Sequence, residues 1–376
     1  MDMLVPTVQV APATTLIEIN DRPQFVGLAG EWNELVAARN DQPFYRHEFI
    51  RSWIDNFTPT AKLRVMTLRN ERGRLVAVLP LIEQRTALYG LPVRQLVSAG
   101  NDHSNRFDLV AEDDALAGRL IFRHLADDRS WDVVCIKDVV DDGGAVHLYE
   151  AARQAGFPTG TWESQRSPYI PLCKSFDELM QPISTKFKAN LRRRRKRLEE
   201  QGVVSCRRVT GGHELEAVMV AGFTLEQEGW KGAAGTAIAQ DPRTRGFYTD
   251  LAHATAPLGY LALYALYLNE RMVAFQYGLE YQGVYSLLKV GYDESLSACS
   301  PGQLLVEEVL KDNVRRGLRE FDFLGPSMAW KRDWTDRVRP HQWLFVFRKN
   351  PFGWMLGQAK FTLGPRVKKA VASWRQ

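Results

Sequence analysis

The sequence contains few cysteines and none of the spacings that mark a metal or disulfide site. Its four cysteines are Cys135, Cys173, Cys206 and Cys299, which lie far apart and form no C-x-x-C pair. This distribution excludes a zinc ribbon and a disulfide scaffold, and it is typical of a reducing compartment. We therefore expect a cytoplasmic protein without a metal.

Long apolar runs and targeting signals are also missing. No apolar run approaches the ~18 residues of a membrane span, and the N-terminus lacks a basic region followed by an apolar core. The sequence contains no Walker A loop, no G-x-S-x-G elbow and no H-E-x-x-H helix. We expect no membrane span, no P-loop nucleotide site, no serine-hydrolase elbow and no zinc-protease site.

The bulk composition is that of a globular protein. The 376 residues are 45% hydrophobic and 25% charged, and this length predicts two domains. The formal net charge of +5 hints at an anionic ligand.

The stretch 261–316 carries the clearest secondary-structure signals. Three segments rich in Tyr, Leu and Val are separated by polar turns at 269–271 and 280–283, which predicts an antiparallel three-stranded unit. A helix should follow. Ser300 suits the N-cap, Pro301 suits the first helical position, and Gln303 completes an S-x-x-Q capping box.

The start of this helix is a candidate anion site. The first backbone N–H groups of a helix have no partner within it, and the helix dipole adds about half a positive charge there. Gly302 has no Cβ and would let a phosphate approach the backbone closely. The alternative is a surface helix that merely follows a strand.

The chain divides into two parts with a similar order of expected elements. In each part helices come first, followed by a hairpin meander, a helix and a strand, which suggests an internal duplication. Two prolines within 164–171 indicate the crossing between the parts. We expect an N-terminal domain without cofactor over 1–163, a C-terminal catalytic domain over 164–350 and a basic amphipathic tail over 351–376.

The second part resembles the GNAT acyltransferase superfamily, and more closely its CelD-like acetyltransferase branch with Fem-like tandem domains. The resemblance covers about residues 165–350, and the first part only through its order of elements. The implied fold is mixed α/β (α+β), with two tandem GNAT-like domains, each a mixed, mainly antiparallel sheet flanked by helices. The residues that carry it are Glu228-Gly229-Trp230-Lys231-Gly232, Leu288-Lys289-Val290, Ser300-Pro301-Gly302-Gln303, Asp322-Phe323-Leu324-Gly325 and Lys331-Arg332-Asp333-Trp334.

In that superfamily acyl-CoA lies where two neighbouring parallel strands separate. The resemblance places these strands at 284–290 and 321–324. It implies acetyl-CoA, or another acyl-CoA, as co-substrate and no metal. The implied cofactor contacts are Leu288, Lys289 and Val290 for the pantetheine arm, and Ser300, Gly302, Gln303 and Leu304 for the diphosphate.

The implied reaction is attack of an amine on a thioester, which requires a proton acceptor and stabilisation of an oxyanion. Glu228 is the candidate base, with a plain helix-end carboxylate as the alternative. Asp322 lies on a short apolar strand and needs a partner, which Lys331 or Arg332 would supply, so a structural ion pair is the alternative. The residues expected at the catalytic centre are Glu228, Asp322 and Lys331, and those expected to contact the acceptor are Trp230, Lys231, Tyr277 and Trp334.

Residues 186–197 include eight Lys or Arg side chains in twelve positions. Phe187, Leu191 and Leu198 give this expected helix only a thin apolar seam. We interpret it as a cationic wall for the CoA 3′-phosphate, a nucleotide- or lipid-linked acceptor, or tRNA. A solvated helix face is the alternative, and the lack of interleaved aromatic residues disfavours nucleic acid.

Two further residues have a possible chemical role. His103, in a polar loop over 100–106, is a candidate base, and Cys299, beside the helix start, is a candidate nucleophile. An incidental position is the alternative for both, since direct transfer needs no covalent intermediate.

These observations favour an acyl-CoA-dependent N-acyltransferase, in particular an acetyltransferase. Its acceptor would be a small-molecule or sugar-linked amine in polysaccharide or cell-envelope biosynthesis, a class that rests on the resemblance alone. One alternative is a Fem-type aminoacyltransferase that uses aminoacyl-tRNA. Another is a non-catalytic scaffold of a polysaccharide-synthesis complex.

Overall fold

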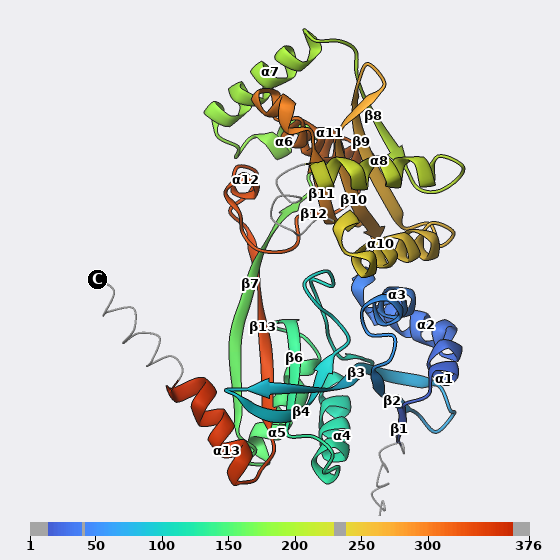
Figure 1. The fold of residues 1–376 in the computed structure, drawn as a ribbon, viewed down its shortest axis with the longest axis vertical. Helices are drawn as coiled ribbons and strands as arrows, with labels where there is room; N and C mark the ends of the chain where they lie inside the picture. The colour runs from blue at the N-terminus through green and yellow to red at the C-terminus, as the bar shows by residue number, and fades with distance from the viewer. Residues whose placement is uncertain (1–13, 40–41, 229–237, 364–376) are drawn as a thin grey trace, which may run out of the picture.

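The structure is a computed structural model that describes residues 14–39, 42–228 and 238–363 (Figure 1). Its centre is a mixed sheet of thirteen strands in the order β1-β2-β3-β4-β6-β13-β7-β12-β11-β10-β9-β8, with β5 paired to β3. Most neighbouring strands are antiparallel, and helices cover both faces. The predicted mixed, mainly antiparallel sheet flanked by helices is confirmed.

The first half supplies seven strands. They are β1 (Thr15–Ile19), β2 (Lys62–Arg69), β3 (Leu75–Leu88), β4 (Leu91–Ser98), β5 (Val110–Ala111), β6 (Val133–Val140) and β7 (Thr159–Pro171). Its α-helices are α1 (Arg22–Gly27), α2 (Ala29–Arg39), α3 (His47–Phe57), α4 (Asp114–Asp127) and α5 (Ala145–Gln154).

The second half supplies six strands. They are β8 (Val204–Val209), β9 (Leu261–Leu268), β10 (Arg271–Tyr281), β11 (Val284–Tyr292), β12 (Glu320–Asp322) and β13 (Val338–Phe347). Its α-helices are α6 (Phe176–Met180), α7 (Thr185–Glu199), α8 (Leu215–Glu228), α10 (Pro242–Thr255), α11 (Pro301–Arg315), α12 (Ala329–Arg332) and α13 (Pro351–Gln358). Short 3-10 turns precede α3, α10 and α11.

Both halves repeat one topology. In the first half β1 to β4 form an antiparallel run, α4 follows, and β6 pairs in parallel with β4. In the second half β8 to β11 form an antiparallel run, α11 follows, and β12 pairs in parallel with β11. The similar order of elements seen in the sequence is therefore a similar order of strands in space.

The halves are joined by strand exchange in the middle of the sheet. The long strand β7 pairs with β13 through Pro168 and then with β12 from Tyr169 to Pro171 (Figure 1). β13, near the end of the chain, lies between β7 and β6 of the first half. Residues 164–171, which the prolines marked as the crossing, are thus a paired strand. Pro168 is tolerated because its missing N–H falls where β7 changes partner.

Two clusters of buried apolar side chains stabilise the molecule. The larger cluster fills the first half. It continues into the second half, on the face of the sheet that α8 and α10 cover. The smaller lies on the opposite face, under α7 and α11. Within the described ranges, every helix is too short or too polar to cross a membrane.

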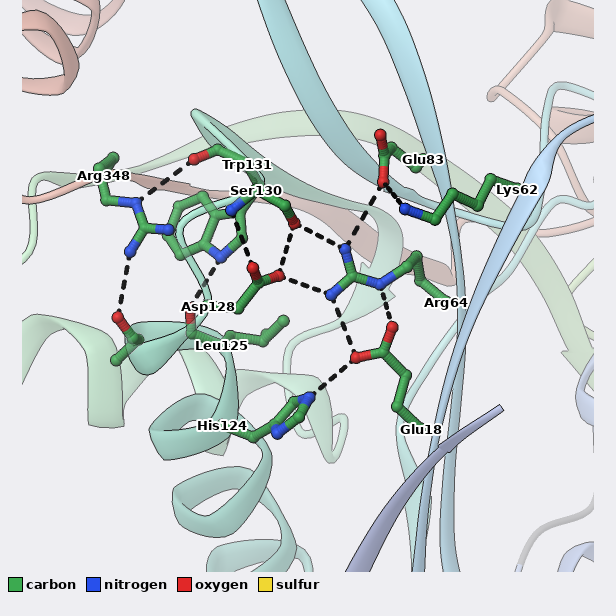
Figure 2. Close-up of polar contacts among 11 residues, drawn as sticks. Glu18, Lys62, Arg64, Glu83, His124, Leu125, Asp128, Ser130, Trp131 and Arg348 are labelled. Carbon is green, nitrogen blue, oxygen red and sulfur yellow. Dashed lines mark hydrogen bonds and ion pairs between the residues drawn. The ribbon is translucent and has the colours of Figure 1, made fainter. Parts of the chain in front are cut away.

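A buried arginine connects β1 and β2 to the segment after α4 (Figure 2). Arg64 donates to both carboxylate oxygens of Glu18, to Asp128 at 2.7 Å and to Ser130 at 2.9 Å. Burial would raise the pKa of Asp128, but hydrogen bonds from Ser130 and Arg64 outweigh it and lower this pKa to about 2. Because the acidic groups around Arg64 offset its charge, we assign the cluster a role in stability.

Candidate active site

Strand β12 pairs with only the first three residues of β11. The ladder consists of Val284 with Glu320, Tyr285 with Phe321 and Ser286 with Asp322. β12 then ends, whereas β11 continues to Tyr292. The parallel ladder therefore ends after the third pair, and we call the region beside the remaining part of β11, residues 287–292, the strand opening.

A β-bulge reshapes β11 at this opening. Tyr277 of β10 pairs with Lys289, but the next residue, Gly278, pairs with Leu287, so Leu288 is an extra residue. Leu287 packs in the smaller core and Leu288 against the larger one. Because of this bulge, the side chains of Leu288 and Lys289 lie on the same face of the sheet, which is the face covered by α8 and α10.

The start of α11 follows this strand after a 3-10 turn at Glu294–Cys299, but it is not capped as predicted. Ser300 occupies the N-cap position in the left-handed region, with φ 46°, and its side chain makes no capping bond. Its hydroxyl donates to the Ser297 carbonyl at 3.2 Å. The predicted capping box is therefore wrong, because the left-handed backbone turns the Ser300 side chain away from the helix.

The amides at the start of α11 are only partly open. Gln303 N and Leu304 N donate to the Ser300 carbonyl at 3.0 and 3.2 Å. The Gly302 N–H has no acceptor among the described residues. A Cβ on Gly302 would lie 3.4 Å from the Tyr292 ring, which is ordinary contact. Of the residues expected to contact the diphosphate, Gly302 thus offers an open amide at the positive end of the helix, whereas the amides of Gln303 and Leu304 are already bonded.

The Gln303 side chain connects α11 to the segment around α12. Its amide donates to the Trp330 carbonyl at 3.2 Å and its carbonyl accepts from Trp334 Nε1 at 2.5 Å. Trp334 is buried and packs edge-on against Phe187 of α7 at 5.0 Å. Trp334, predicted to contact the acceptor, therefore supports the helix start.

Asp322 and Lys331 do not pair with each other. Asp322 is fully buried and accepts from Arg106, from Arg339 at 2.8 Å and from the Leu324 backbone at 2.8 Å. Lys331 donates to the carbonyls of Leu324 at 2.5 Å and Pro326 at 3.1 Å. The predicted Asp322 partner is thus corrected: two arginines from the first half and β13 take that role, while Lys331 fixes the loop after β12. Arg332 is exposed.

A buried polar network surrounds Asp322. Arg106, from the loop that follows β4, also donates to Gln42 and, at 3.3 Å, to His341 on β13. Burial, assisted by the neighbouring Arg106, lowers the pKa of His341 to about 4, so this ring is neutral near neutral pH. The network joins the first half to the end of β12.

A cleft of about 710 Å³ opens beside this network. It is lined by Arg39, Asp108, Asp114, Tyr169 and Arg339. Asp108 accepts from the backbone of Leu109, Gly144 and Ala145, so its carboxylate is committed to the start of α5. The cleft belongs to the first half, β7 and β13 and does not include the β11 side of the strand opening.

Glu228, the predicted base, is exposed at the end of α8. Glu226, on the same helix, is 2% exposed. The motifs in the sequence did not single it out as a candidate base. Its carboxylate accepts from Ile238 N at 2.9 Å and lies 4.0 Å from Lys289 Nζ. A signal was present, because Glu226 falls four residues after Gly222 and seven after Met219, on the apolar face of the helix.

Aromatic side chains line the same region. Lys289 Nζ lies over the Tyr248 ring at 5.6 Å, and the Tyr248 hydroxyl is 3.2 Å from His103 Nδ1. Tyr277 is fully buried and donates to the Tyr248 carbonyl at 2.9 Å. The predicted acceptor contact Tyr277 therefore supports Tyr248 from within the core. His103 does lie in this region, as part of a stack with Phe57.

The remaining expected residues divide into three groups. Leu288, Lys289 and Val290 border the strand opening, and all are half-buried. Trp230 and Lys231 lie outside the described residues. Cys299 is a buried free thiol that contacts Gln201 Nε2 at 3.4 Å. Among the described side chains there is no group of three His, Cys, Asp or Glu residues placed to hold a metal.

Comparison with known proteins relates part of the chain to one domain family. The acetyltransferase (GNAT) domain family matches residues 185–332, which include the strand opening and α11. A search of curated proteins gave no significant match.

Several solved structures share the fold at low sequence identity. FemX superposes with a TM-score of 0.58 at 12% identity, covering 91% of this chain and 100% of FemX. L-PGS from Bacillus licheniformis gives 0.53 at 12%, covering 92% and 97%. A conserved protein of unknown function from Bacteroides thetaiotaomicron gives 0.54 at 11%, covering 89% and 100%. Residues 185–332 thus match the acetyltransferase (GNAT) domain family, and the chain as a whole shares the fold of FemX, with one topology repeated in its two halves.

Proposed function

We propose that this protein is an acyl-CoA-dependent N-acyltransferase, in particular an acetyltransferase. The observation that carries the proposal is the separation of β11 from β12 beside the start of α11. Because β12 ends after three pairs, an extended thioester arm would lie beside the rest of β11. The positive end of α11 stands next to that arm for a diphosphate.

The residues present fit such a co-substrate. The Gly302 N–H and the α11 dipole would hold a diphosphate oxygen, while Gln303 and Trp334 fix the first turn. The backbone around Leu288 and Val290, beyond the last β12 pair, would accompany the pantetheine arm. When bound, acyl-CoA supplies the activated acyl group; the protein positions it and manages the proton of the acceptor.

We propose that the first half holds no acyl-CoA. Its counterpart of α11 is α4, whose N-cap Asp113 accepts from Leu116 N at 2.8 Å. Asp114 adds a second carboxylate in that first turn, so a diphosphate would be repelled. The gap between β4 and β6 is also narrowed, because Ser98 Oγ accepts from Lys137 N at 2.9 Å. We keep 1–163, 164–350 and 351–376 as the proposed domains, with β13 exchanged between the first two.

The acceptor in this proposal is a primary amine on a sugar or other precursor of polysaccharide or cell-envelope biosynthesis, in the cytoplasm. The resemblance to CelD-like acetyltransferases supports this acceptor class. A sugar amine is consistent with an opening bordered by both polar and aromatic side chains, such as Lys289 and Tyr248.

The first test is calorimetry with acetyl-CoA and two variants of equal size. Gly302→Glu places a carboxylate beside the open amide and should weaken binding at least tenfold, about 1.4 kcal/mol. Gly302→Gln has the same shape without the charge and should bind more tightly than Gly302→Glu. Cys299→Ala should bind like the wild type, since no covalent step is needed. Absence of micromolar binding to the wild type would remove the proposal.

A second candidate is aminoacyl transfer from tRNA, as in Fem-type enzymes. The observation that favours it is α7, whose cations Lys186, Arg192, Arg193, Lys196 and Arg197 are exposed and form no ion pair with described residues. Salt-sensitive binding of tRNA without binding of acetyl-CoA would establish this candidate. Binding of neither ligand would support the scaffold alternative.

A further inference from the structure

We propose that Glu226 accepts the proton of the acceptor amine and that Lys289 holds the oxygen of the thioester carbonyl. The inference rests on the proposed function and assigns its proton acceptor and oxygen contact. Glu226 stands on α8 and Lys289 on β11, and neither role follows from the motifs that identify the fold.

The position of Glu226 relative to β11 supports this role. A Cβ on Gly291 would lie 3.1 Å from Glu226 Cα, so α8 and β11 nearly touch at that glycine. Gly291 and Lys289 both belong to the part of β11 that continues beyond its last β12 pair. The carboxylate of Glu226 therefore lies over the strand opening, on the side away from α11.

The surroundings of the pair suit an ionised carboxylate. A carboxylate that is 2% exposed needs opposite charge and hydrogen bonds to stay ionised. Lys289 Nζ, at 4.0 Å, supplies the charge and the Ile238 N–H, at 2.9 Å, supplies a hydrogen bond. An arriving ammonium group would find in Glu226 both a negative charge and a proton acceptor.

Lys289 is held where a developing oxyanion needs a cation. Its side chain is 14% exposed, and its ammonium lies over the ring of Tyr248, which is fully buried. His103, from the first half, contacts the hydroxyl of Tyr248, the residue whose ring lies under the Lys289 ammonium. A cation in a site of low water content stabilises an oxyanion more strongly than a cation in bulk water.

The reaction balances with these two groups. Glu226 takes one proton from the acceptor R–NH3+, and the free amine nitrogen forms a C–N bond to the thioester carbon. The carbonyl oxygen becomes an anion beside Lys289. The C–S bond then breaks, and the second nitrogen proton passes to the leaving sulfur, which gives the amide and CoA–SH. Glu226 releases its proton to solvent, so one proton is released per turnover.

The test uses the full chain, acetyl-CoA and two small probes, with loss of thioester absorbance as the readout. Ethanolamine is an ammonium ion at neutral pH, like other alkylamines with a pKa near ~10, whereas hydroxylamine is already a free base. Glu226→Gln retains an oxygen for the Ile238 N–H but cannot take a proton. We expect it to slow the reaction with ethanolamine by about 10²–10⁴-fold and to leave the hydroxylamine reaction nearly unchanged.

Two variants on α8 serve as comparisons. Glu216→Gln changes an exposed residue that pairs with His253 at 2.7 Å, and both rates should stay at the wild-type value. Glu228→Gln tests the base expected from the sequence, and loss confined to that variant would overturn the inference. Lys289→Met should slow the reactions of both probes, because the oxyanion forms in each.

The remaining outcomes separate the inference from the proposed function. Equal losses with both probes in Glu226→Gln would overturn the inference, because a structural defect does not distinguish nucleophiles. A wild type that binds acetyl-CoA but reacts with neither probe would also overturn it and leave co-substrate binding intact. Failure of the wild type to bind acetyl-CoA would overturn the proposed function itself.

Discussion

At the scale of single residues, buried charges connect parts of the chain that are distant in sequence. Asp322 on β12 is neutralised by Arg106, 216 residues earlier, and by Arg339 on β13. Glu48 at the start of α3 accepts from Tyr260 in the second half, while Arg46 lies over the rings of Tyr260 and Tyr281. These contacts make the interface between the halves specific as well as stable.

Removal of the Arg106 guanidinium tests this interpretation. Arg106→Met leaves the fully buried Asp322 with one arginine instead of two, and we expect the free energy of unfolding to fall by about 3 kcal/mol. The matched change Arg166→Met breaks an ion pair with Glu163 in which both side chains are about 60% exposed. It should cost less than about 0.5 kcal/mol in urea denaturation. If the two substitutions lowered the free energy of unfolding equally, the buried Arg106–Asp322 pair would contribute no more to stability than an exposed pair.

The sequence predicted that a buried charged group needs a partner, but it did not predict which residue the partner is. Asp322 lies between two phenylalanines, so a partner had to exist. Arg106 belongs to a loop, however, and no local pattern in the sequence specifies where that loop lies. Glu226 shows the reverse case. Its place on the apolar face of α8 was readable, yet the neighbouring motif at 228–232 drew attention to Glu228.

At the scale of elements, the sequence predicted the antiparallel strands correctly where short turns between them determine the structure. Asn269 and Glu270 have φ of 49° and 63°, and Gln282 and Gly283 have φ of 50° and 76°. Both pairs form the two-residue turns that match the twist of antiparallel strands. The start of α11 was located but its cap was not, because the left-handed Ser300 depends on the preceding 3-10 turn.

The basic helix α7 divides into a bound and an exposed face. Phe187, Leu191 and Leu198 are buried as expected. Arg195 contacts Glu307 and Glu308 of α11 at 2.8 and 2.6 Å. The beginning of α7 lies close to the start of α11, because Phe187 packs on Trp334, which donates to Gln303.

The exposed face of α7 should affect binding and not stability. We expect the triple change of Lys186, Arg193 and Arg197 to Gln to weaken acetyl-CoA binding three- to tenfold, because less positive charge faces the phosphates. The midpoint of urea denaturation should stay within experimental error. Arg195→Gln should instead lower that midpoint. Unchanged acetyl-CoA affinity, together with lost tRNA binding, would favour the aminoacyl candidate.

At the scale of the whole molecule, shared strands join the two halves, and we expect them to unfold as one cooperative unit. β7 contributes to both parts of the sheet, and β13 completes the first half from the far end of the chain. The sequence showed the repeated order of elements but placed β13 with the second half. Local sequence patterns cannot predict strand exchange, because β13 would have the same alternation of buried and exposed side chains in either half.

A chain that ends at residue 337 tests this unity. It lacks Leu344, Phe345, Val346 and Phe347, all buried, whose burial is worth about 8 kcal/mol, comparable to the stability of a whole domain. We expect no cooperative thermal transition, and recovery of one when residues 338–363 are supplied as a separate peptide. A truncated chain whose first half still melts cooperatively would contradict the expectation.

The late arrival of β13 has a consequence for synthesis in the cell. β6 leaves the ribosome about 200 residues before its neighbour β13 does, a delay of roughly 10–40 s at ordinary translation rates. During that interval β6 presents a bare edge to other nascent chains. We expect newly made protein to need a chaperone that shields this edge until translation ends.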